Sequence, residues 1–241
     1  MKVIEPSFEI IEGLTYQQML QIVEGAYRIC YASEPKGDAE EFIRSKMKLQ
    51  HLTPIEHILI TVDFTMNRGV THELVRHRVA TFSQQSTRYC NYGKDKFGKE
   101  ITVTNPPFFN PLENTKDIAL PYPAFYKENT SWHLIDSGFA DVYTLNKFDV
   151  WYIACLYSEW AYMTLLKMGA TPQEARSVLP NSLAAKIRIS ANLREWRLIL
   201  NQRAIGITGK PHPEMLASML PVLERFKKDY PVFFEDLIVK E

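Results

Sequence analysis

The chain has 241 residues, of which 46% are hydrophobic and 23% charged, and its 28 Lys and Arg balance its 28 Asp and Glu. This composition is typical of a globular protein and excludes a chain that is disordered by composition. The even charge balance argues against a broad nucleic-acid-binding surface, which usually requires a basic excess. Cys30, Cys90 and Cys155 are widely spaced and form no CxxC or zinc pattern, so we expect a reduced, cytoplasmic protein.

The N-terminal segment carries Glu5, Pro6 and Glu9 within its apolar run. We therefore expect it not to be a signal peptide. The sequence contains no run of eighteen apolar residues, so we expect no membrane-spanning segment.

The first half of the chain alternates strand and helix patterns. In chain order, we predict a strand over 2–11, helices over 14–31 and 39–50, a strand over 58–66, a short helix over 70–78 and an extended segment over 80–92. Asp38 is a candidate cap for the second helix, with Glu41 as its capping-box partner. Pro54 is expected to stop that helix, and Thr71 to cap the short one.

The second half begins with a glycine- and proline-rich stretch at about 93–130, which we expect to be a surface excursion around one strand at 100–106. Further patterns predict helices over 130–169, 171–180, 193–206, 213–231 and 232–238, and a strand over 186–192. Gly169 and Gly206 are expected to end their helices, and Thr171 with Pro172 to begin one. The sequence therefore predicts one α+β domain over 1–241, with mixed helices around a mainly antiparallel sheet.

A cationic stretch at 76–89, RHRVATFSQQSTRY, is the first candidate site. The chain has no GxGxxG and no GxxxxGK[ST], so a bound phosphate would have to be held by side chains. Arginine suits this role because its planar guanidinium makes paired bonds to phosphate oxygens. Arg76, Arg78 and Arg88 could therefore form an anion pocket, or they could be a solvated helix end.

The segment HLTPIEH at 51–57 is a weak metal motif. Its histidines are six residues apart across Pro54, which is not the i, i+4 spacing of a helical zinc site. A loop that enters a strand with a hydrogen-bonded histidine is the better interpretation, and we expect no metal.

Two side chains in the cationic stretch are candidate nucleophiles. Ser86 has no GxSxG turn around it, so a hydroxyl that binds an anion is a safer role than attack. Cys90 would be the better nucleophile in an electropositive pocket, but a buried, small apolar residue is the alternative.

A second cationic stretch lies at 191–203, ANLREWRLILNQR. Arg194 and Arg197 occupy neighbouring positions on one face of the predicted helix, and Arg203 points elsewhere. The alternative is an amphipathic helix whose arginines are only solvated.

Together, four segments resemble the flavin-dependent thymidylate synthases. Arg76-His77-Arg78, followed after seven residues by Ser86 and then Arg88-Tyr89, matches the signature of that family. HLTPIEH resembles its His-x-Thr-Pro-x-Glu-His segment, and EARSVLPNS at 174–182 its Ala-Arg-x-x-Leu-Pro segment. NLREW at 192–196, with Arg203 nine residues after Arg194, resembles its C-terminal helix.

The resemblance implies a methyltransferase with the α+β fold of this family. Its expected reaction is the reductive methylation of dUMP to dTMP, with methylenetetrahydrofolate as carbon donor, NADPH as reductant and FAD as intermediary. It implies no protein nucleophile. It also implies a homotetramer whose active sites, with FAD at the interfaces, are shared between subunits, and no nucleic-acid or membrane partner.

The resemblance also implies roles for individual residues. The expected flavin-binding residues are Thr53, Arg76, His77, Arg78, Gln84, Asn192 and Arg194. The expected dUMP-binding residues are Glu73, Arg76, Gln85, Ser86, Thr87, Arg88, Arg176 and Arg203. Arg203 is the candidate for polarising the pyrimidine, and His51 is expected near flavin and folate. Some members have Gln at the position of Glu73 and Glu at that of Gln84.

Two other functions remain compatible with these residues. The chain could be a nucleotide-binding regulatory protein without turnover, or a methyltransferase that depends on Cys90. A flavin spectrum on purification would distinguish a flavin-dependent thymidylate synthase from both of these alternatives.

Overall fold

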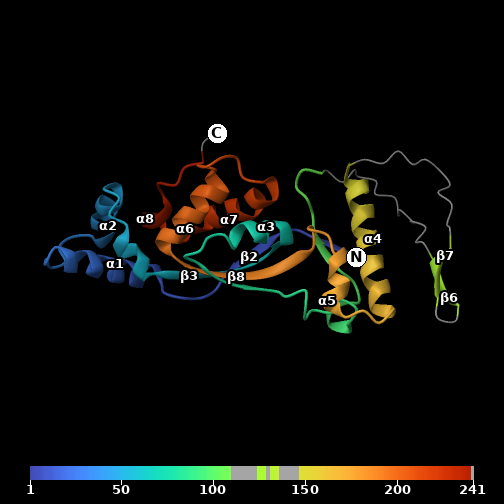
Figure 1. Cartoon of the computed structure of the whole chain (residues 1–241). Coiled ribbons are helices and arrows are strands. Elements are labelled where there is room, and N and C mark those ends of the chain that lie inside the picture. The colour runs from blue at the N-terminus through green and yellow to red at the C-terminus, as the bar shows by residue number, and fades with distance from the viewer. Residues whose placement is uncertain (110–123, 129–130, 136–146, 240–241) are drawn as a thin grey trace. The chain divides into compact units, whose positions relative to one another are not determined.

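The computed structural model describes residues 1–109, 124–128, 131–135 and 147–239 (Figure 1). They form two compact units. The larger unit comprises 4–85 and 184 to the C-terminal end, and the smaller comprises 1–3 and 86–183. Among the described residues, no helix has the length and apolar character needed to cross a membrane.

The larger unit is built on a four-stranded antiparallel sheet in the order β2-β3-β8-β4. Its strands are β2 Ser7–Ile10, β3 Leu59–Asn67, β4 Thr81–Gln84 and β8 Ala184–Asn192. Its α-helices are α1 Tyr16–Cys30, α2 Ala39–Lys48, α3 Arg68–Leu74, α6 Leu193–Leu200, α7 Pro213–Asp229 and α8 Pro231–Phe234. A 3₁₀ turn, η1 Thr53–His57, and a π-helical segment, η4 Asn201–Ile205, complete it. The predicted α+β class with a mainly antiparallel sheet is confirmed.

One face of this sheet is apolar because alternate residues of β3 and β8 are hydrophobic. The buried side chains of this face are Ile60, Val62, Phe64 and Met66 of β3 and Ala185, Ile187, Ile189 and Ala191 of β8. On the other face the register places Asp63 opposite Arg188, and the two form an ion pair. The alternation of apolar and polar residues along β3 and β8 thus places one face of the sheet against the core and leaves the other face to polar pairs.

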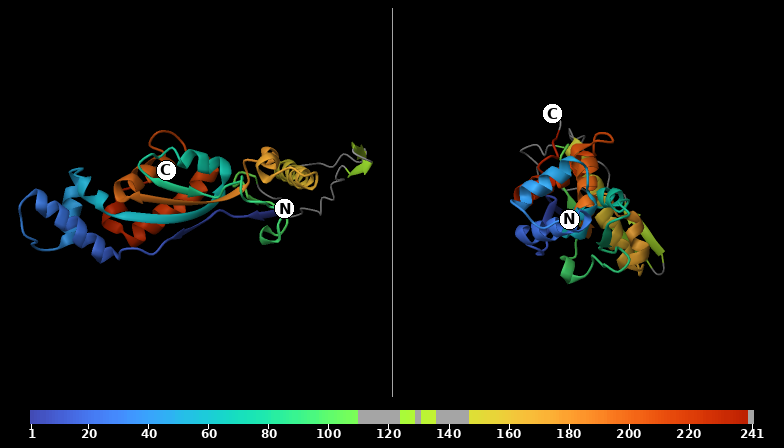
Figure 2. Two further views of the ribbon diagram at one scale, coloured as in Figure 1. Left: turned by 60° about the horizontal axis from the view of Figure 1, so that its bottom comes forward. Right: turned by 90° about the vertical axis from the view of Figure 1, so that its left-hand side faces the viewer.

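Helices α6 and α7 pack against this framework (Figures 1 and 2). Trp196 of α6 is fully buried, and its indole N–H donates to the Ile60 carbonyl at 2.9 Å. Its ring also lies edge-on to Phe226 of α7, with the centroids 5.3 Å apart. Because this large aromatic side chain is buried with its N–H hydrogen-bonded, it fixes α6 against β3.

The smaller unit has its own core around α4 Lys147–Lys167. Strand β1 Lys2–Ile4 pairs with β5 Thr102–Thr104, and Val103 bridges to Leu183. Its other elements are η2 Asp95–Phe97, α5 Pro172–Ala175, η3 Arg176–Val178 and the hairpin of β6 Ala124–Glu128 with β7 Ser131–Ile135. The core contains Tyr92, Ile101, Val103, Cys155, Tyr162, Ala175 and Leu183.

Several predicted boundaries are confirmed. Thr171 caps α5 through a full capping box with Glu174, and Pro172 follows it. Asp38 caps α2, but its side chain accepts from the amide of Glu40, so the predicted bond to Glu41 is wrong. The strand inside the predicted excursion is present as β5, whereas residues 110–123 and 129–130 lie outside the described part of the chain.

Four local predictions are wrong. The short helix begins at Arg68 under an Asn67 cap, and Thr71 lies inside it with its hydroxyl donating to the Arg68 carbonyl. The helix α2 ends at Lys48, before Pro54, which instead lies in the first turn of η1.

The other two wrong predictions concern the smaller unit. The helix predicted over 130–169 is described from Lys147, as α4 Lys147–Lys167, whereas 131–135 form a strand, and residues 130 and 136–146 lie outside the described part of the chain. Apolar periodicity alone does not distinguish a short strand from part of a helix. The extended segment at 80–92 ends at Gln84, since the amide of Cys90 turns back to the Ser86 carbonyl at 3.0 Å.

The predicted helix over 193–206 is not α-helical throughout. It changes to the π form at Asn201, and the amide of Gly206 closes it by donating to the Asn201 carbonyl at 2.9 Å. Gly206 has a φ of 80°, where an L side chain is strained. A Cβ there would lie 2.8 Å from Pro211 Cδ and 2.9 Å from the Gly209 carbonyl oxygen. Both constraints require glycine where the segment carrying Arg203 ends.

We expect Gly206→Ala to destabilise the protein more than Gly37→Ala. Gly37 has a similar φ of 76°, but a Cβ added there would meet no described atom within 4 Å, so it carries the backbone strain without the clash. The difference should be about 1–3 kcal/mol, since strain and steric conflict add at Gly206. Urea unfolding of both variants measures it, and equal losses would contradict the steric argument.

Candidate active site

Arg203 is the centre of a polar cluster in the larger unit. Its Nη1 donates to the Glu73 carboxylate at 3.0 Å, and its Nη2 to the Glu73 backbone carbonyl at 3.3 Å. Its Nε donates to His77 Nε2 at 3.2 Å. All three nitrogens of the guanidinium are therefore held by two residues from α3 and the turn after it.

These contacts determine the state of His77. Because the guanidinium has only donors, Nε2 must be unprotonated and the neutral imidazole carries its proton on Nδ1. That nitrogen lies 3.3 Å from the Glu195 carboxylate. His77 and Glu195 are each only 6% exposed. Burial, with Arg203 adding to it, lowers the pKa of His77 to about 4, and burial raises the pKa of Glu195.

The Arg-His-Arg motif lies in the turns that follow α3. The amide of Arg76 donates to the Glu73 carbonyl at 3.3 Å, and that of His77 to the Leu74 carbonyl at 3.0 Å. This backbone turns the imidazole into the protein and leaves Arg76 and Arg78 exposed. The motif thus supplies one buried acceptor and two exposed cations.

A second cluster, in the smaller unit, contains four of the predicted dUMP-binding side chains, those of Ser86, Thr87, Arg88 and Arg176. The Ser86 hydroxyl accepts from the amide of Arg88 at 3.2 Å. The guanidinium of Arg88 donates from Nε to Gln173 at 2.7 Å, and that of Arg176 donates from Nη1 to the buried Thr87 hydroxyl at 3.4 Å. Two guanidinium groups and two hydroxyls in one cluster form a donor set suited to an anion.

The two glutamines that precede Ser86 in the sequence belong to the larger unit. The amide of Gln84 donates from Nε2 to the Thr71 hydroxyl at 2.7 Å. Gln85 is held by the backbone of Lys186, because the backbone amide of Gln85 donates to the Lys186 carbonyl at 2.9 Å. These contacts hold the strand that leads to Ser86.

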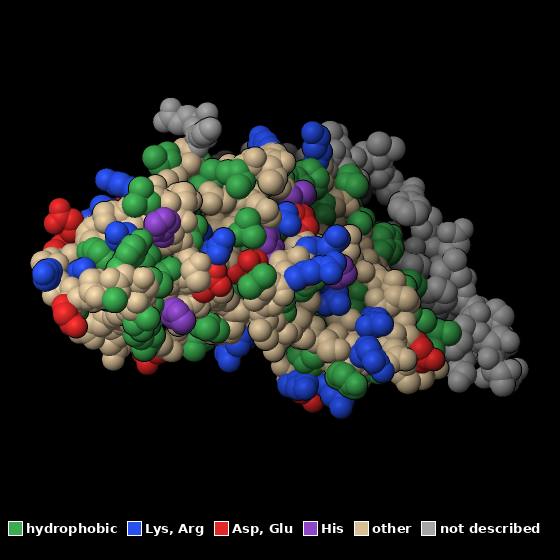
Figure 3. Space-filling view, turned by 60° about the vertical axis from the view of Figure 1, so that its left-hand side comes forward, with side chains coloured by type: hydrophobic (Ala, Val, Ile, Leu, Met, Phe, Trp, Pro, Cys, Tyr) green, Lys and Arg blue, Asp and Glu red, His purple; other side chains and the backbone are tan. Residues whose placement is uncertain are grey.

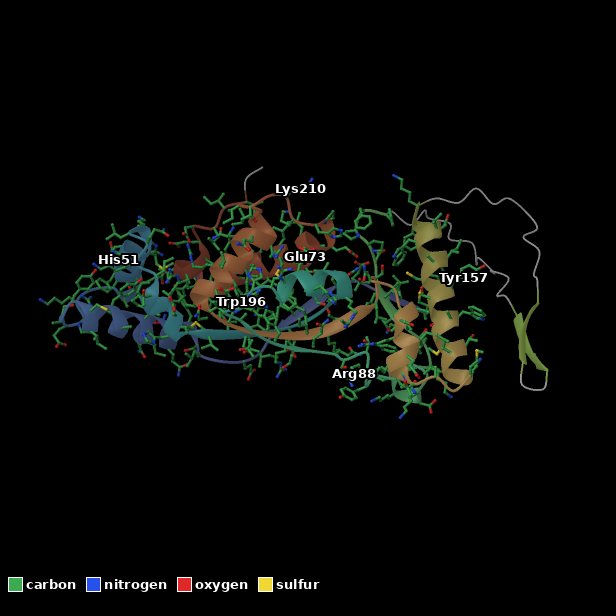
Figure 4. All side chains as sticks on the ribbon, in the orientation of Figure 1. His51, Glu73, Arg88, Tyr157, Trp196 and Lys210 are labelled. Carbon is green, nitrogen blue, oxygen red and sulfur yellow. The ribbon has the colours of Figure 1, made fainter. Side chains whose placement is uncertain are left out.

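The remaining predicted residues lie elsewhere in the larger unit. His51 follows α2, and in Figure 4 it lies well away from Glu73. Its Nδ1 is 3.2 Å from the Tyr31 hydroxyl, and its carbonyl accepts from the Tyr27 hydroxyl. The structure therefore does not bring the two predicted catalytic residues, His51 and Arg203, together within one chain.

The segment at 51–57 meets the start of α6. Arg194 donates to the Glu56 carboxylate at 2.7 Å, beside the exposed Thr53. Asn192 is the cap of α6, and its side chain accepts from the amide of Glu195 at 2.8 Å. Thr53, Asn192 and Arg194 thus come from η1, the last residue of β8 and the first turn of α6.

The arrangement of the α6 arginines differs from the prediction. Arg194 is exposed, but Arg197 is buried and donates from both terminal nitrogens to Asp236. The prediction that they share a face, and the alternative that all are solvated, are both wrong for Arg197. The pairing depends on where α8 places Asp236, which a helical spacing rule does not include.

Three contacting residues were missed in the sequence: Glu195, Gln173 and Glu56. Glu195 stands three residues after a capping Asn, a position where an acid usually serves the helix end, so nothing local marks it as a partner of His77. Glu56 lies inside the segment at 51–57 and Gln173 directly precedes the segment at 174–182, but both bind arginines distant in sequence. Among the described residues, no three His, Cys, Asp or Glu side chains form a metal-binding group.

Each unit offers exposed cations. Arg76 and Arg78 of the larger unit and Arg88 and Arg176 of the smaller unit are exposed, and acidic and basic side chains both reach the face drawn in Figure 3. Separate guanidinium groups, each able to make paired bonds, suit ligands with several phosphate or carboxylate groups. The residues present therefore fit a nucleotide and a dinucleotide cofactor.

The chain matches a family model over residues 14–232, that of the thymidylate synthase complementing protein. It is 28% identical over 225 residues to a flavin-dependent thymidylate synthase of Corynebacterium efficiens, covering 91% of this chain and 80% of that one. It is 26% identical over 221 residues to one of Geobacter sulfurreducens, covering 88% and 78%.

A solved structure shares the fold. The UMP/dUMP methylase PolB from Streptomyces cacaoi, bound with 5-Br dUMP, aligns with a TM-score of 0.69 and 21% identity over 98% of this chain and 96% of that one.

The low pKa of His77 predicts an acid-dependent loss of stability. Between the ordinary value of 6.5 and about 4, the unfolded chain binds a proton at His77 that the folded chain does not. The contribution of neutral His77 to the free energy of unfolding is therefore complete above pH 6.5 and is lost as the pH falls toward 4. From pH 7 to 5 the wild type should therefore lose about 2 kcal/mol more than His77→Gln, which cannot titrate. Urea unfolding at each pH tests this, and parallel profiles would contradict it.

Proposed function

The chain belongs to the thymidylate synthase complementing protein family, and from this premise we propose that it is a flavin-dependent thymidylate synthase. It methylates dUMP reductively to dTMP, with methylenetetrahydrofolate as carbon donor, NADPH as reductant and FAD as the bound intermediary. The observation that carries the proposal is the guanidinium of Arg203, fixed at the end of α6–η4 by Glu73 and His77. The relatives named as flavin-dependent thymidylate synthases support it.

The substrate dUMP carries a phosphate and a uracil, and two clusters, which the proposed shared site takes from different subunits, match these two parts. Arg88, Arg176 and the hydroxyls of Ser86 and Thr87 offer donors for the phosphate. Arg203 offers donors for the pyrimidine. A related fold that holds 5-Br dUMP, in a UMP/dUMP methylase, supports a uracil nucleotide as the ligand.

Arg203 has the electrostatic role in this reaction. Methylation requires C5 of the uracil to become nucleophilic, and negative charge then develops on the ring after N3 loses its proton. A fixed cation beside the ring stabilises this charge without having to reorganise, which can contribute several kcal/mol in a water-poor site. Lysine would keep the charge but lose the planar donor array.

The FAD site is proposed from exposed arginines and from uncharged polar side chains of the larger unit. Arg76, Arg78 and Arg194 would bind its pyrophosphate and ring edges, and Thr53, Gln84 and Asn192 would add neutral contacts. Reduced flavin, when bound, supplies the hydride of the reaction. Because it does so, no protein thiol or hydroxyl is required to form a covalent adduct with dUMP.

The carboxylate of Glu73 distinguishes this chain from relatives with Gln at that position. It is 3.0 Å from Arg203 Nη1 and partly exposed. In this arrangement it compensates part of the charge of Arg203 before substrate binds. Glu73 and Gln85 belong to the proposed dUMP site, and His51 is proposed to lie near flavin and folate.

Assembly is part of the proposal. Within one chain His51 lies well away from Glu73 (Figure 4), which is the partner of Arg203, so a site that uses both His51 and Arg203 needs a second subunit. A homotetramer with shared sites satisfies this requirement. The cytoplasmic location stays a prediction from the cysteine pattern.

We expect Arg203→Lys to lower turnover more than stability. At saturating dUMP, dTMP formation should fall by at least about tenfold, because the planar fork is lost, while the thermal midpoint changes little. Cys90→Ala is the matched control. Cys90 packs against the smaller core, and its loss should leave turnover nearly intact if no thiol attacks dUMP. Normal turnover of Arg203→Lys would remove it from the mechanism, and inactive, folded Cys90→Ala would favour the thiol mechanism.

Mixing two inactive variants tests the shared site. Arg88→Ala and Arg203→Ala should each be nearly inactive alone. If one site takes Arg88 and Arg203 from different chains, random subunit exchange restores both in about a quarter of the sites. Exchange is confirmed by native mass spectrometry. Exchanged samples with no more activity than the separate variants would contradict a site shared in this way.

A further inference from the structure

Glu195 is a buried carboxylate that is neither a substrate-binding nor a flavin-binding residue of the proposed reaction. It lies in the first turn of α6, where its amide donates to the Asn192 side chain at 2.8 Å. The next residue, Trp196, is fully buried and bonded to the Ile60 carbonyl at 2.9 Å. Figure 4 labels Trp196 on α6 and Glu73 on α3. The carboxylate of Glu195 is therefore carried by a helix turn that is fixed at both its cap and its core face.

The contacts of Glu195, His77 and Arg203 run in one direction. An ionised Glu195 has acceptors only, and its carboxylate lies 3.3 Å from His77 Nδ1, so it faces the N–H on that nitrogen. His77 then presents Nε2 as an acceptor, and Arg203 Nε donates to it at 3.2 Å. The opposite tautomer would place two N–H groups against each other at Arg203 and two acceptors against each other at Glu195. Glu195 thus fixes which nitrogen of His77 faces the guanidinium.

We propose that Glu195 and His77 are positioning residues that hold the guanidinium of Arg203 in the orientation required for the reaction, an inference that rests on the proposed function. Neither residue needs to touch the substrate. The pair acts on Nε, which leaves Nη1 and Nη2 to face Glu73 or the ligand. A metal-binding histidine uses a carboxylate in the same way to fix its tautomer and ring orientation.

Glu195→Gln is the principal test. Glutamine has the same shape, but its amide can either accept from Nδ1–H or donate to a bare Nδ1, so the tautomer of His77 is no longer fixed. We expect kcat for dTMP formation to fall by about tenfold, as for the loss of one hydrogen bond to a charged group. The Kd for dUMP, measured by calorimetry, should change by less than about threefold, since the phosphate donors remain.

Glu214→Gln is the matched control. Glu214 is also a buried carboxylate whose pKa burial raises, and it accepts from Asn67 Nδ2 at 3.0 Å. Within the described part of the chain its carboxylate pairs with Asn67 and His212 rather than with His77 or Arg203, so its variant should keep kcat. An equal fall of kcat in both variants would overturn the positioning role, because it would report a general loss of packing. An unchanged kcat in Glu195→Gln, or a loss confined to dUMP binding, would also overturn it.

A pair of His77 variants gives a second measurement. His77→Gln can present an amide oxygen near the place of Nε2, whereas His77→Leu has no acceptor. We expect kcat to be higher in His77→Gln than in His77→Leu, with thermal midpoints measured for both. If Leu is as active as Gln, the acceptor at this position does not matter and the inference is wrong.

A measurement without turnover separates this inference from the proposed function. The absence of dTMP from the wild type, supplied with FAD, dUMP, methylenetetrahydrofolate and NADPH, would end the proposed function. The ¹⁵N shifts of the labelled His77 ring still report its tautomer. The Nδ1–H form should dominate in the wild type and lose population in Glu195→Gln. Equal tautomers in the two proteins would overturn the positioning pair.

Discussion

The pairing of β3 with β8 is the constraint on which the larger unit depends. Nine residue pairs run in register from Leu59 opposite Asn192 to Asn67 opposite Ala184. Each strand ends in an asparagine that caps the following helix, Asn67 for α3 and Asn192 for α6. Because the strands are antiparallel, the two helices begin at opposite ends of the pair. The thirteen residues of α6 and η4 run about 20 Å, most of the roughly 30 Å of β8, which brings Arg203 back to α3.

This geometry explains why residues distant in sequence meet at Arg203. His77 is 126 residues away and Glu73 is 130 residues away. The motif that carries His77 was recognisable from the sequence, as were the strands of the larger unit, the caps Asp38 and Thr171, and the helix that carries Arg203. Its contact with His77 was not, because it depends on strand register and on the π-helical turn at 201–205. A helix pattern with a period of 3.6 residues does not distinguish that turn from an α-helix.

The errors in the sequence analysis share this physical origin. Arg194 and Arg197 are three residues apart, but Arg197 is buried because α8 brings Asp236 to it. Thr71 is a good cap by type, yet Asn67 takes that role because β3 ends there and its side chain accepts two amides. In each case a local preference was overridden by a tertiary contact. The proposed binding roles of the exposed arginines rest on the family resemblance.

The two partners of Arg203 have different electrostatic consequences. Glu73 is partly exposed and carries a charge that opposes the guanidinium, whereas His77 is buried, and its low pKa keeps it neutral. A neutral acceptor can fix the direction of Arg203 without cancelling its charge. In the proposed reaction, a substrate that displaces Glu73 therefore meets a cation that is already oriented and no longer compensated on that side. An arginine held only by carboxylates would gain the same rigidity but lose the charge that the developing uracil anion requires.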